Sequence, residues 1–230
     1  MSSPGRPYLV EVVGVAGAGK STLVRLLCAD GERFRRAEFI HARNPAHLAE
    51  IARSLPRLLP ILARNVMPGR RLTWREVKLL VYASSWHRLL GRKATYRDTV
   101  TLLDQGPIYA LVRLTANGAR VTRSASFARW RDQVLDAWSG RLGAVVWLDA
   151  DDRILLDRIE GRARTHGTKD QPEAVGRAFL ARYRELFAEL LDRLERRGRP
   201  PILRFDTGKT GSEQLAADVR QALDVGVESS

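Results

Sequence analysis

The sequence predicts an α/β fold in which a five-stranded parallel sheet carries helices on both faces. Short apolar segments of strand length alternate along the chain with longer segments of helical periodicity, the pattern of a parallel sheet joined by crossover helices. A glycine-rich segment separates the first strand from the first helix. The 230 residues show no repeat and no linker, so we expect one domain over residues 1–230.

The glycine-rich segment is the most informative motif. Gly14–Ser21 matches the phosphate-binding pattern G-x-x-x-x-G-K-[ST] at every fixed position. The β-branched run 8–13 precedes it, and an apolar helix from Ser21, ended by Gly31, follows it. Strand, loop and helix are the arrangement that binds phosphate, because backbone N–H groups and the helix N-terminus attract the anion. The expected nucleotide-binding residues are Gly14, Ala16, Gly17, Ala18, Gly19, Lys20, Ser21 and Thr22.

The remaining elements follow in order. A second strand is expected at 36–42 and a helix at 44–65, which Pro56 and Pro60 should bend or break. The segment Thr73–Glu76 reads as a capping box that opens a helix ending at Leu90. Further strands are expected at 99–104, 143–149 and 201–205. Further helices are expected from about 107, at 124–139, from 151 to 160, at 172–197 and at 212–224.

Asp104 is the main candidate acid, because it ends an apolar strand whose carboxyl end should meet the loop at one edge of the sheet. It is expected to hold Mg²⁺ with Ser21, or to accept the proton of an acceptor hydroxyl. The alternative is an Asp that only caps a turn. Asp149 ends another strand and ranks second, because the following Asp151 and Asp152 suggest helix capping.

The segment 158–171 is expected to form a lid. It contains Arg158, Arg162, Arg164, Lys169 and two glycines, and arginines that close over a triphosphate would stabilise the charge of phosphoryl transfer. The alternative is a solvated basic loop. His166 is interpreted as a bystander, because phosphoryl transfer depends mainly on positioning and charge.

The net charge of +13 is concentrated in one part of the chain. Residues 33–97 hold fifteen Lys or Arg and three Asp or Glu, which indicates an anionic partner. A coding bias toward Arg would explain why Arg outnumbers Lys in this chain, but it does not explain why Asp and Glu are scarce in residues 33–97. On the helix within this region, Trp86 and Arg88 suggest a mixed stacking and charge site, although aromatic side chains at helical spacing are more often core.

These motifs resemble those of the phosphate-loop nucleoside and nucleotide kinases, and most closely the thymidylate kinase-like group. Arg43-Asn44-Pro45 stands where that group has Arg-Glu-Pro, and Asp104-Gln105 stands where it has Asp-Arg. The turn from Phe205 to Gly208 resembles the turn near adenine. The resemblance implies ATP with Mg²⁺ as donor, catalytic roles for Lys20, Asp104 and the lid arginines, and an acceptor region at 41–95 that includes Arg43 and Gln105. The changed residues at 44 and 105 disfavour thymidylate as acceptor.

The sequence therefore predicts a kinase that phosphorylates a small anionic acceptor, with a homodimer as one option for its assembly. A polynucleotide end kinase or nucleic-acid-stimulated NTPase is the alternative suggested by the basic region. A nucleotide switch is disfavoured, because the chain lacks Asn-Lys-x-Asp and Leu-Ser-Gly-Gly-Gln motifs. A single Cys excludes an internal disulfide and a Cys-based zinc site. With no apolar membrane span and no signal peptide in the sequence, a cytoplasmic location away from membranes is expected.

Overall fold

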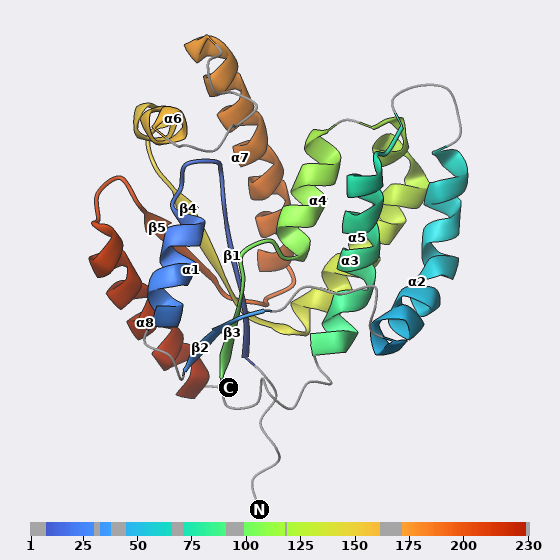
Figure 1. Ribbon diagram of the computed structural model, residues 1–230, viewed down its shortest axis with the longest axis horizontal. Helices are drawn as coiled ribbons and strands as arrows, with labels where there is room; N and C mark the ends of the chain where they lie inside the picture. The colour runs from blue at the N-terminus through green and yellow to red at the C-terminus, as the bar shows by residue number, and fades with distance from the viewer. Residues whose placement is uncertain are drawn as a thin grey trace, which may run out of the picture.

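Five parallel strands form the centre of the computed structural model, in the order β2-β3-β1-β4-β5 (Figure 1). The strands are β1 (Tyr8–Gly14), β2 (Phe34–Arg36), β3 (Val100–Leu103), β4 (Leu142–Asp149) and β5 (Ile202–Asp206). The structure describes residues 8–29, 33–37, 45–65, 71–90, 99–117, 119–161 and 172–228. The predicted parallel sheet with helices on both faces is confirmed.

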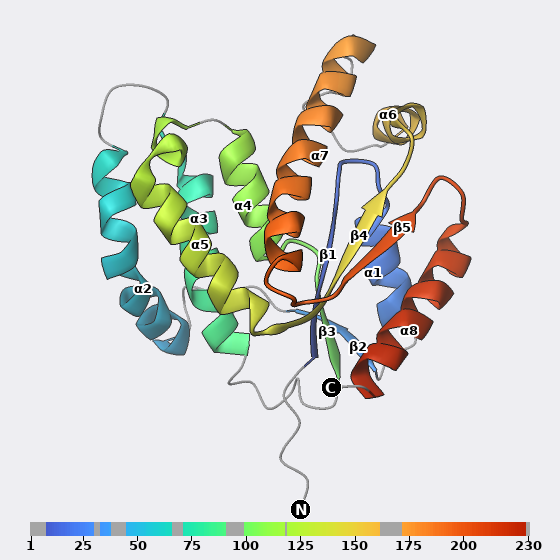
Figure 2. The same cartoon turned by 180° about the vertical axis from the view of Figure 1, so that it is seen from behind.

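Two helical layers cover the sheet (Figures 1 and 2). On one face, α1 (Lys20–Ala29) packs beside α8 (Ser212–Glu228). On the other, α4 (Pro107–Ala116) packs beside α7 (Glu173–Glu195), and α3 (Trp74–Leu90), α5 (Ala125–Ser139) and α2 (Pro45–Arg64) extend this layer away from the sheet. A short 3₁₀ turn, Arg120–Arg123, precedes α5, and α6 (Asp152–Glu160) lies close to the phosphate-binding loop.

The central strand β1 contributes side chains to both hydrophobic cores. Leu9 and Val13 join the core under α4 and α7, whereas Val10 and Val12 join the core under α1 and α8. This alternation follows from the two-residue period of a strand. All four side chains are at most 2% exposed, which a strand with helices on both faces requires.

Pro56 and Pro60 lie inside one continuous helix, α2, so of the expected bend or break the break does not occur. Both prolines are exposed, and the carbonyl groups that lose a helical partner can be hydrated on that side. Leu58 and Ile61 are buried against the neighbouring helices, and this packing holds the helix together.

The capping box at the start of α3 is confirmed. The Thr73 N–H donates to Glu76 Oε2 at 2.7 Å, and the Glu76 N–H donates to Thr73 Oγ1 at 3.3 Å. Asn117, at the end of α4, also donates to Glu76 Oε1 at 2.8 Å. The start of α3 therefore lies beside the end of α4, and the two helices run in opposite directions.

The second strand is shifted from its expected position. Among the described residues it covers Phe34–Arg36, which pair with Val100–Leu102 of β3, so it begins before the expected range 36–42. Residues 38–44 lie outside the described residues, as do Gly31 and Gly91, the two expected helix ends. None of the helices that the structure describes is long and apolar enough to cross a membrane.

Candidate active site

The phosphate-binding loop depends on three glycines with positive φ: Gly14 at +153°, Gly17 at +86° and Gly19 at +83°. A Cβ on Gly14 would lie 2.2 Å from the Leu148 carbonyl oxygen of β4. A Cβ on Gly17 would lie 2.7 Å from the Leu155 carbonyl oxygen of α6. The loop therefore has the form that its sequence predicts, and two of its glycines let it pack against neighbouring backbone.

Lys20 begins helix α1, and its ammonium group bends back over the loop. Nζ donates to the carbonyl oxygens of Gly14 and Val15, at 2.7 Å each. Ser21 and Thr22 follow in the first turn of α1 with exposed side chains. The positive end of the helix dipole, the ammonium group and two hydroxyls thus gather at one point, which suits an anion.

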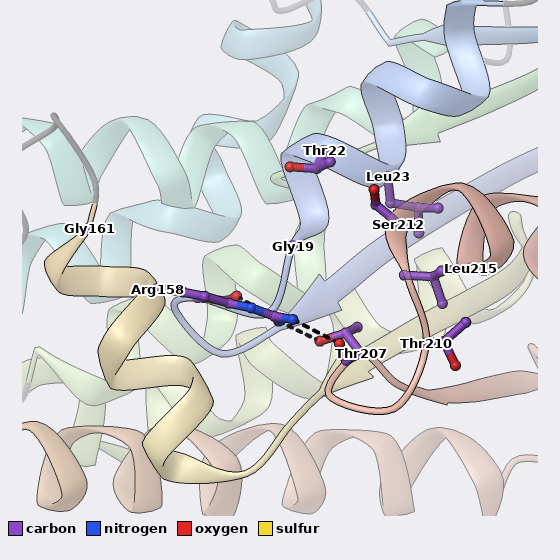
Figure 3. Close-up of a pocket in the computed structure, with 10 residues that line it drawn as sticks. Gly19, Thr22, Leu23, Arg158, Gly161, Thr207, Thr210, Ser212 and Leu215 are labelled. Atoms are coloured by element: carbon purple, nitrogen blue, oxygen red, sulfur yellow. Dashed lines mark hydrogen bonds between the residues drawn. The ribbon is translucent and has the colours of Figure 1, made fainter.

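A cavity of about 430 Å³ lies beside the loop, and we call it the Arg158 cavity after one of its lining residues (Figure 3). Gly17, Gly19 and Thr22 form one wall, and the end of α6 forms a second. The turn between β5 and α8 closes the third side, through Thr207 and Thr210. The cavity is therefore on the β4 and β5 side of the loop.

Arg158 reaches across this cavity from α6 to the turn after β5 (Figure 3). Its Nη1 donates to Thr207 Oγ1 at 2.9 Å and its Nη2 donates to the Thr207 carbonyl at 2.8 Å. The Thr207 N–H in turn donates to the Asp149 carbonyl at 2.8 Å. Arg158 therefore belongs to the last turn of a helix and is fixed to the cavity wall, a different position from the mobile lid expected from the sequence. Arg162, Arg164, His166 and Lys169 lie outside the described residues.

Asp104 and Asp149 have different surroundings. Asp104 directly follows β3, is 7% exposed, and forms an ion pair with Arg36 of β2. Asp149 receives the Ala150 N–H on Oδ1 at 2.9 Å and Arg184 Nε on Oδ2 at 2.7 Å. The Asp149 carboxylate thus holds the turn between β4 and α6 to helix α7. This structural role agrees with the ranking of Asp149 below Asp104 as a candidate catalytic acid.

Glu11 is the important residue that sequence reasoning missed. It lies in the middle of β1, fully buried, and its carboxyl oxygens accept the N–H groups of Ile108 at 3.1 Å and Tyr109 at 2.9 Å. These N–H groups at the start of α4 have no partner within the helix, so a carboxyl group on β1 caps a helix that follows β3. Burial raises the pKa of Glu11 to about 8. An acid inside an otherwise apolar strand was the available signal.

Gly106 is required by this contact. A Cβ there would come within 2.5 to 2.8 Å of the Glu11 side chain. The turn of Asp104, Gln105 and Gly106 is thus held at its far end by the capped helix and at its near end by β3.

A second cavity, of about 520 Å³, lies along α3. It is bounded by the first half of α3, by Leu48 and Ile51 of α2, and by Gln105. We call it the α3 groove. Gln105, a predicted acceptor-binding residue, lines this groove next to Asp104 and on the β3 side of the loop.

The structure contradicts the expectation for Trp86. Its ring is 3% exposed and packs between Tyr82 and Trp138, at centroid distances of 4.4 and 6.2 Å. Arg88 is also used internally, because its Nε donates at 2.7 Å to the fully buried Glu50. Trp74, in the first turn of the same helix, is instead 73% exposed. Arg43 lies outside the described residues.

Several basic side chains in the described part of the basic region form ion pairs with acids of the same chain. Arg36 pairs with Asp104, Arg53 and Arg88 pair with Glu50, and Arg33 pairs with Asp224 at 2.6 Å. Such pairs reduce the positive field available to a polyanion. The observation weakens the nucleic-acid alternative without removing it.

Residues 9–186 match the family model described as AAA domain. The chain belongs to this family. The match includes the phosphate-binding loop, Asp104, Asp149 and Arg158. A search of curated protein sequences gives no match.

Solved structures of nucleotide kinases share the fold. The thymidylate kinase of Candida albicans superposes with a TM-score of 0.58 and 14% identity, covering 96% of this chain and 92% of that one. Deoxyadenosine kinase from M. mycoides with bound dATP gives a TM-score of 0.55 and 14% identity, covering 94% and 99%. The YorR protein from Bacillus subtilis, in complex with phosphorylated GDP, gives 0.54 and 14%, covering 96% and 98%. The chain therefore has the P-loop nucleotide kinase fold.

Glu11 makes the stability of the protein depend on pH. Its pKa rises from about 4.5 in the unfolded chain to about 8 in the fold, so its contribution is fully present below pH 4.5 and is lost as pH rises through 8. Glu11→Gln cannot ionise. We expect the free energy of unfolding of the wild type, relative to that of Glu11→Gln, to fall by a few kcal/mol between pH 5 and pH 9. This magnitude follows because a difference of one pH unit between the two pKa values corresponds to about 1.4 kcal/mol.

Urea denaturation of both proteins at the two pH values measures this difference. Because all other titrating groups are common to the two chains, their contributions cancel. An equal difference at pH 5 and pH 9 would show that the Glu11 carboxyl does not titrate in this range.

Proposed function

We propose that the protein is an ATP-dependent kinase that transfers the γ-phosphoryl group to a small-molecule acceptor, such as a nucleoside, a nucleotide or another anionic metabolite. One observation carries the proposal. The phosphate-binding loop emerges from β1, with the Arg158 cavity on its β4 and β5 side and the α3 groove on its β3 side. A loop with a separate cavity on each side suits a donor and an acceptor that meet at the transferred phosphoryl group.

The donor half rests on the loop and Arg158. Backbone N–H groups of the loop and the α1 N-terminus would bind the phosphates, and Lys20 would exchange its carbonyl partners Gly14 and Val15 for phosphate oxygens. The planar Arg158 guanidinium, fixed by Thr207, offers a stacking surface for a base. The deoxyadenosine kinase and YorR structures contain bound nucleotides, which supports a nucleotide as a ligand of this fold.

Mg²⁺ fits the donors that are present. Ser21 places a hydroxyl at the start of α1, and Asp104 supplies a carboxylate at the neighbouring strand end. Mg²⁺ characteristically takes few protein ligands and completes its shell with water and phosphate oxygens. Among the described residues no three His, Cys, Asp or Glu side chains gather around one point, so an all-protein cage is not formed there. When bound, the ion would neutralise charge on the phosphates.

Asp104 and the arginines beyond α6 would complete the site. Asp104 precedes Gln105 at the end of the α3 groove, so its carboxylate would orient the acceptor hydroxyl. Arg36 forms an ion pair with this carboxylate and holds it in place. We propose that Arg162 and Arg164 stabilise the charge that develops during phosphoryl transfer, because the sequence predicts that they belong to a lid over the triphosphate.

Lys20→Ala should reduce phosphoryl transfer by at least about a thousandfold, because the ammonium group compensates charge on the transferred phosphoryl group. Turnover of ATP, measured with a coupled ADP assay, tests this expectation. Circular dichroism and thermal melting of the variant control for folding. A variant that kept near-wild-type turnover would contradict the mechanism.

Arg158→Ala should raise the Kd of ATP about tenfold, because the base loses a stacking surface worth about 1 kcal/mol or more. Arg153→Ala is the matched control, since Arg153 is exposed on the same helix but does not line the Arg158 cavity. Calorimetric titration with a non-hydrolysable ATP analogue gives both constants. Equal affinities of the two variants would remove Arg158 from the donor site.

A further inference from the structure

The α3 groove has apolar walls. Its aliphatic and aromatic side chains come from α2 and α3, and they include Leu48, Ile51, Trp74, Val77, Val81 and Tyr82. Two of them are well exposed, Leu48 at 50% and Trp74 at 73%. Exposed apolar side chains that line a cavity indicate a ligand with an apolar body, because burying them against that body is favourable.

The groove is elongated. Its lining residues on α3 extend from Trp74 to Tyr82, which is about 12 Å along a helix axis. Asn117 at the end of α4 contacts Glu76 near the start of α3, so the start of α4 lies toward the later turns of α3. Gln105, just before α4, is therefore at the Tyr82 end.

The two ends of the groove differ in chemistry. The Tyr82 end has Gln105 and, directly before it in the chain, Asp104. The opposite end has Arg75 and Lys78 from the first turns of α3, and Lys78 Nζ lies 5.9 Å from the centre of the Trp74 ring. One end thus faces the reacting groups, whereas the other end carries positive charge suited to an anion.

The described lining is poor in groups that read a nucleobase. Among the described residues that line the groove, Gln105 has the one side-chain amide, and none of these residues has a carboxylate. A pocket that selects a base needs several directed donors and acceptors, because selectivity comes from polar groups left unpaired by the wrong ligand. The groove instead selects for shape and apolar surface.

We propose that the acceptor is an elongated, largely apolar hydroxy compound, with its hydroxyl at the Gln105 end and an anionic group at the Arg75 and Lys78 end. This inference rests on the proposed kinase function and names its substrate class. The hydroxyl oxygen attacks the γ-phosphorus, and the bond from that phosphorus to the β,γ-bridging oxygen breaks. ADP leaves, and the hydroxyl proton passes to Asp104.

Two probes carry the proposed chemistry in different shapes. 10-Hydroxydecanoate is a flexible chain and 6-hydroxy-2-naphthoate is a rigid ring system, and each has a hydroxyl and a carboxylate at opposite ends. Thymidine 5′-monophosphate is the base-containing comparator. Calorimetric titration of the full-length protein, saturated with a non-hydrolysable ATP analogue, measures the three Kd values. We expect at least one probe to bind ten times more tightly than the nucleotide, and the tighter probe identifies a chain or a ring as the body.

Matched variants locate the binding. Leu48→Asp, in the groove wall, should weaken the tighter probe at least tenfold. Leu59→Asp changes a leucine of the same helix that is 58% exposed and outside the groove, and it should leave the Kd unchanged. Lys78→Glu should weaken the carboxylate probe but not its analogue without the carboxylate, decan-1-ol or 2-naphthol.

The inference is overturned if thymidine 5′-monophosphate binds as tightly as both probes or more tightly, or if Leu48→Asp and Leu59→Asp have equal effects. Binding of the ATP analogue alone is measured first in every variant. If the wild type does not bind the ATP analogue, the proposed kinase function itself is wrong. This result is distinct from a failure of the acceptor proposal, in which the analogue binds but the probes do not behave as expected.

Discussion

The central position of β1 in an all-parallel sheet is the constraint on which the site depends. Because β3 and β4 flank β1, the loop at its carboxyl end must emerge between the ends of these two strands. Gly14 allows the loop to begin in close contact with the Leu148 carbonyl of β4, and Gly17 allows it to continue against α6. The loop therefore lies between helix α6, which carries Arg158, and the turn after β3, which carries Asp104.

The buried Glu11 connects this arrangement to the α3 groove. It binds the first N–H groups of α4 from the central strand, at the cost of burying an acid whose pKa rises to about 8. A fixed α4 fixes the turn of Asp104 to Gly106, and α4 in turn supports α3, which forms most of the groove. The sequence Gln105-Gly106-Pro107 is explained by this contact, since Gly106 leaves room for the carboxyl group and Pro107 has no N–H that needs a partner.

Local signals predicted much of the fold. The glycine pattern at 14–19 and the capping box at Thr73 involve neighbours in sequence, and both have the expected geometry. Features that depend on distant partners were missed, misjudged or left open between alternatives. Helix α2 continues through Pro56 and Pro60 because Leu58 and Ile61 are buried by other helices, and Trp86 is core because Trp138, fifty-two residues away, packs on it. The Glu11 contact spans almost a hundred residues, so its partner could not be read from the strand alone.

The central claim is that donor and acceptor occupy opposite sides of the β1 loop. A crystal structure of the protein with Mg²⁺ and a non-hydrolysable ATP analogue tests it most directly. The account predicts phosphates on Gly14–Ser21 and the base in the cavity between Arg158 and the turn after β5, with the α3 groove left open. A base bound in the α3 groove, with the Arg158 cavity vacant, would contradict it.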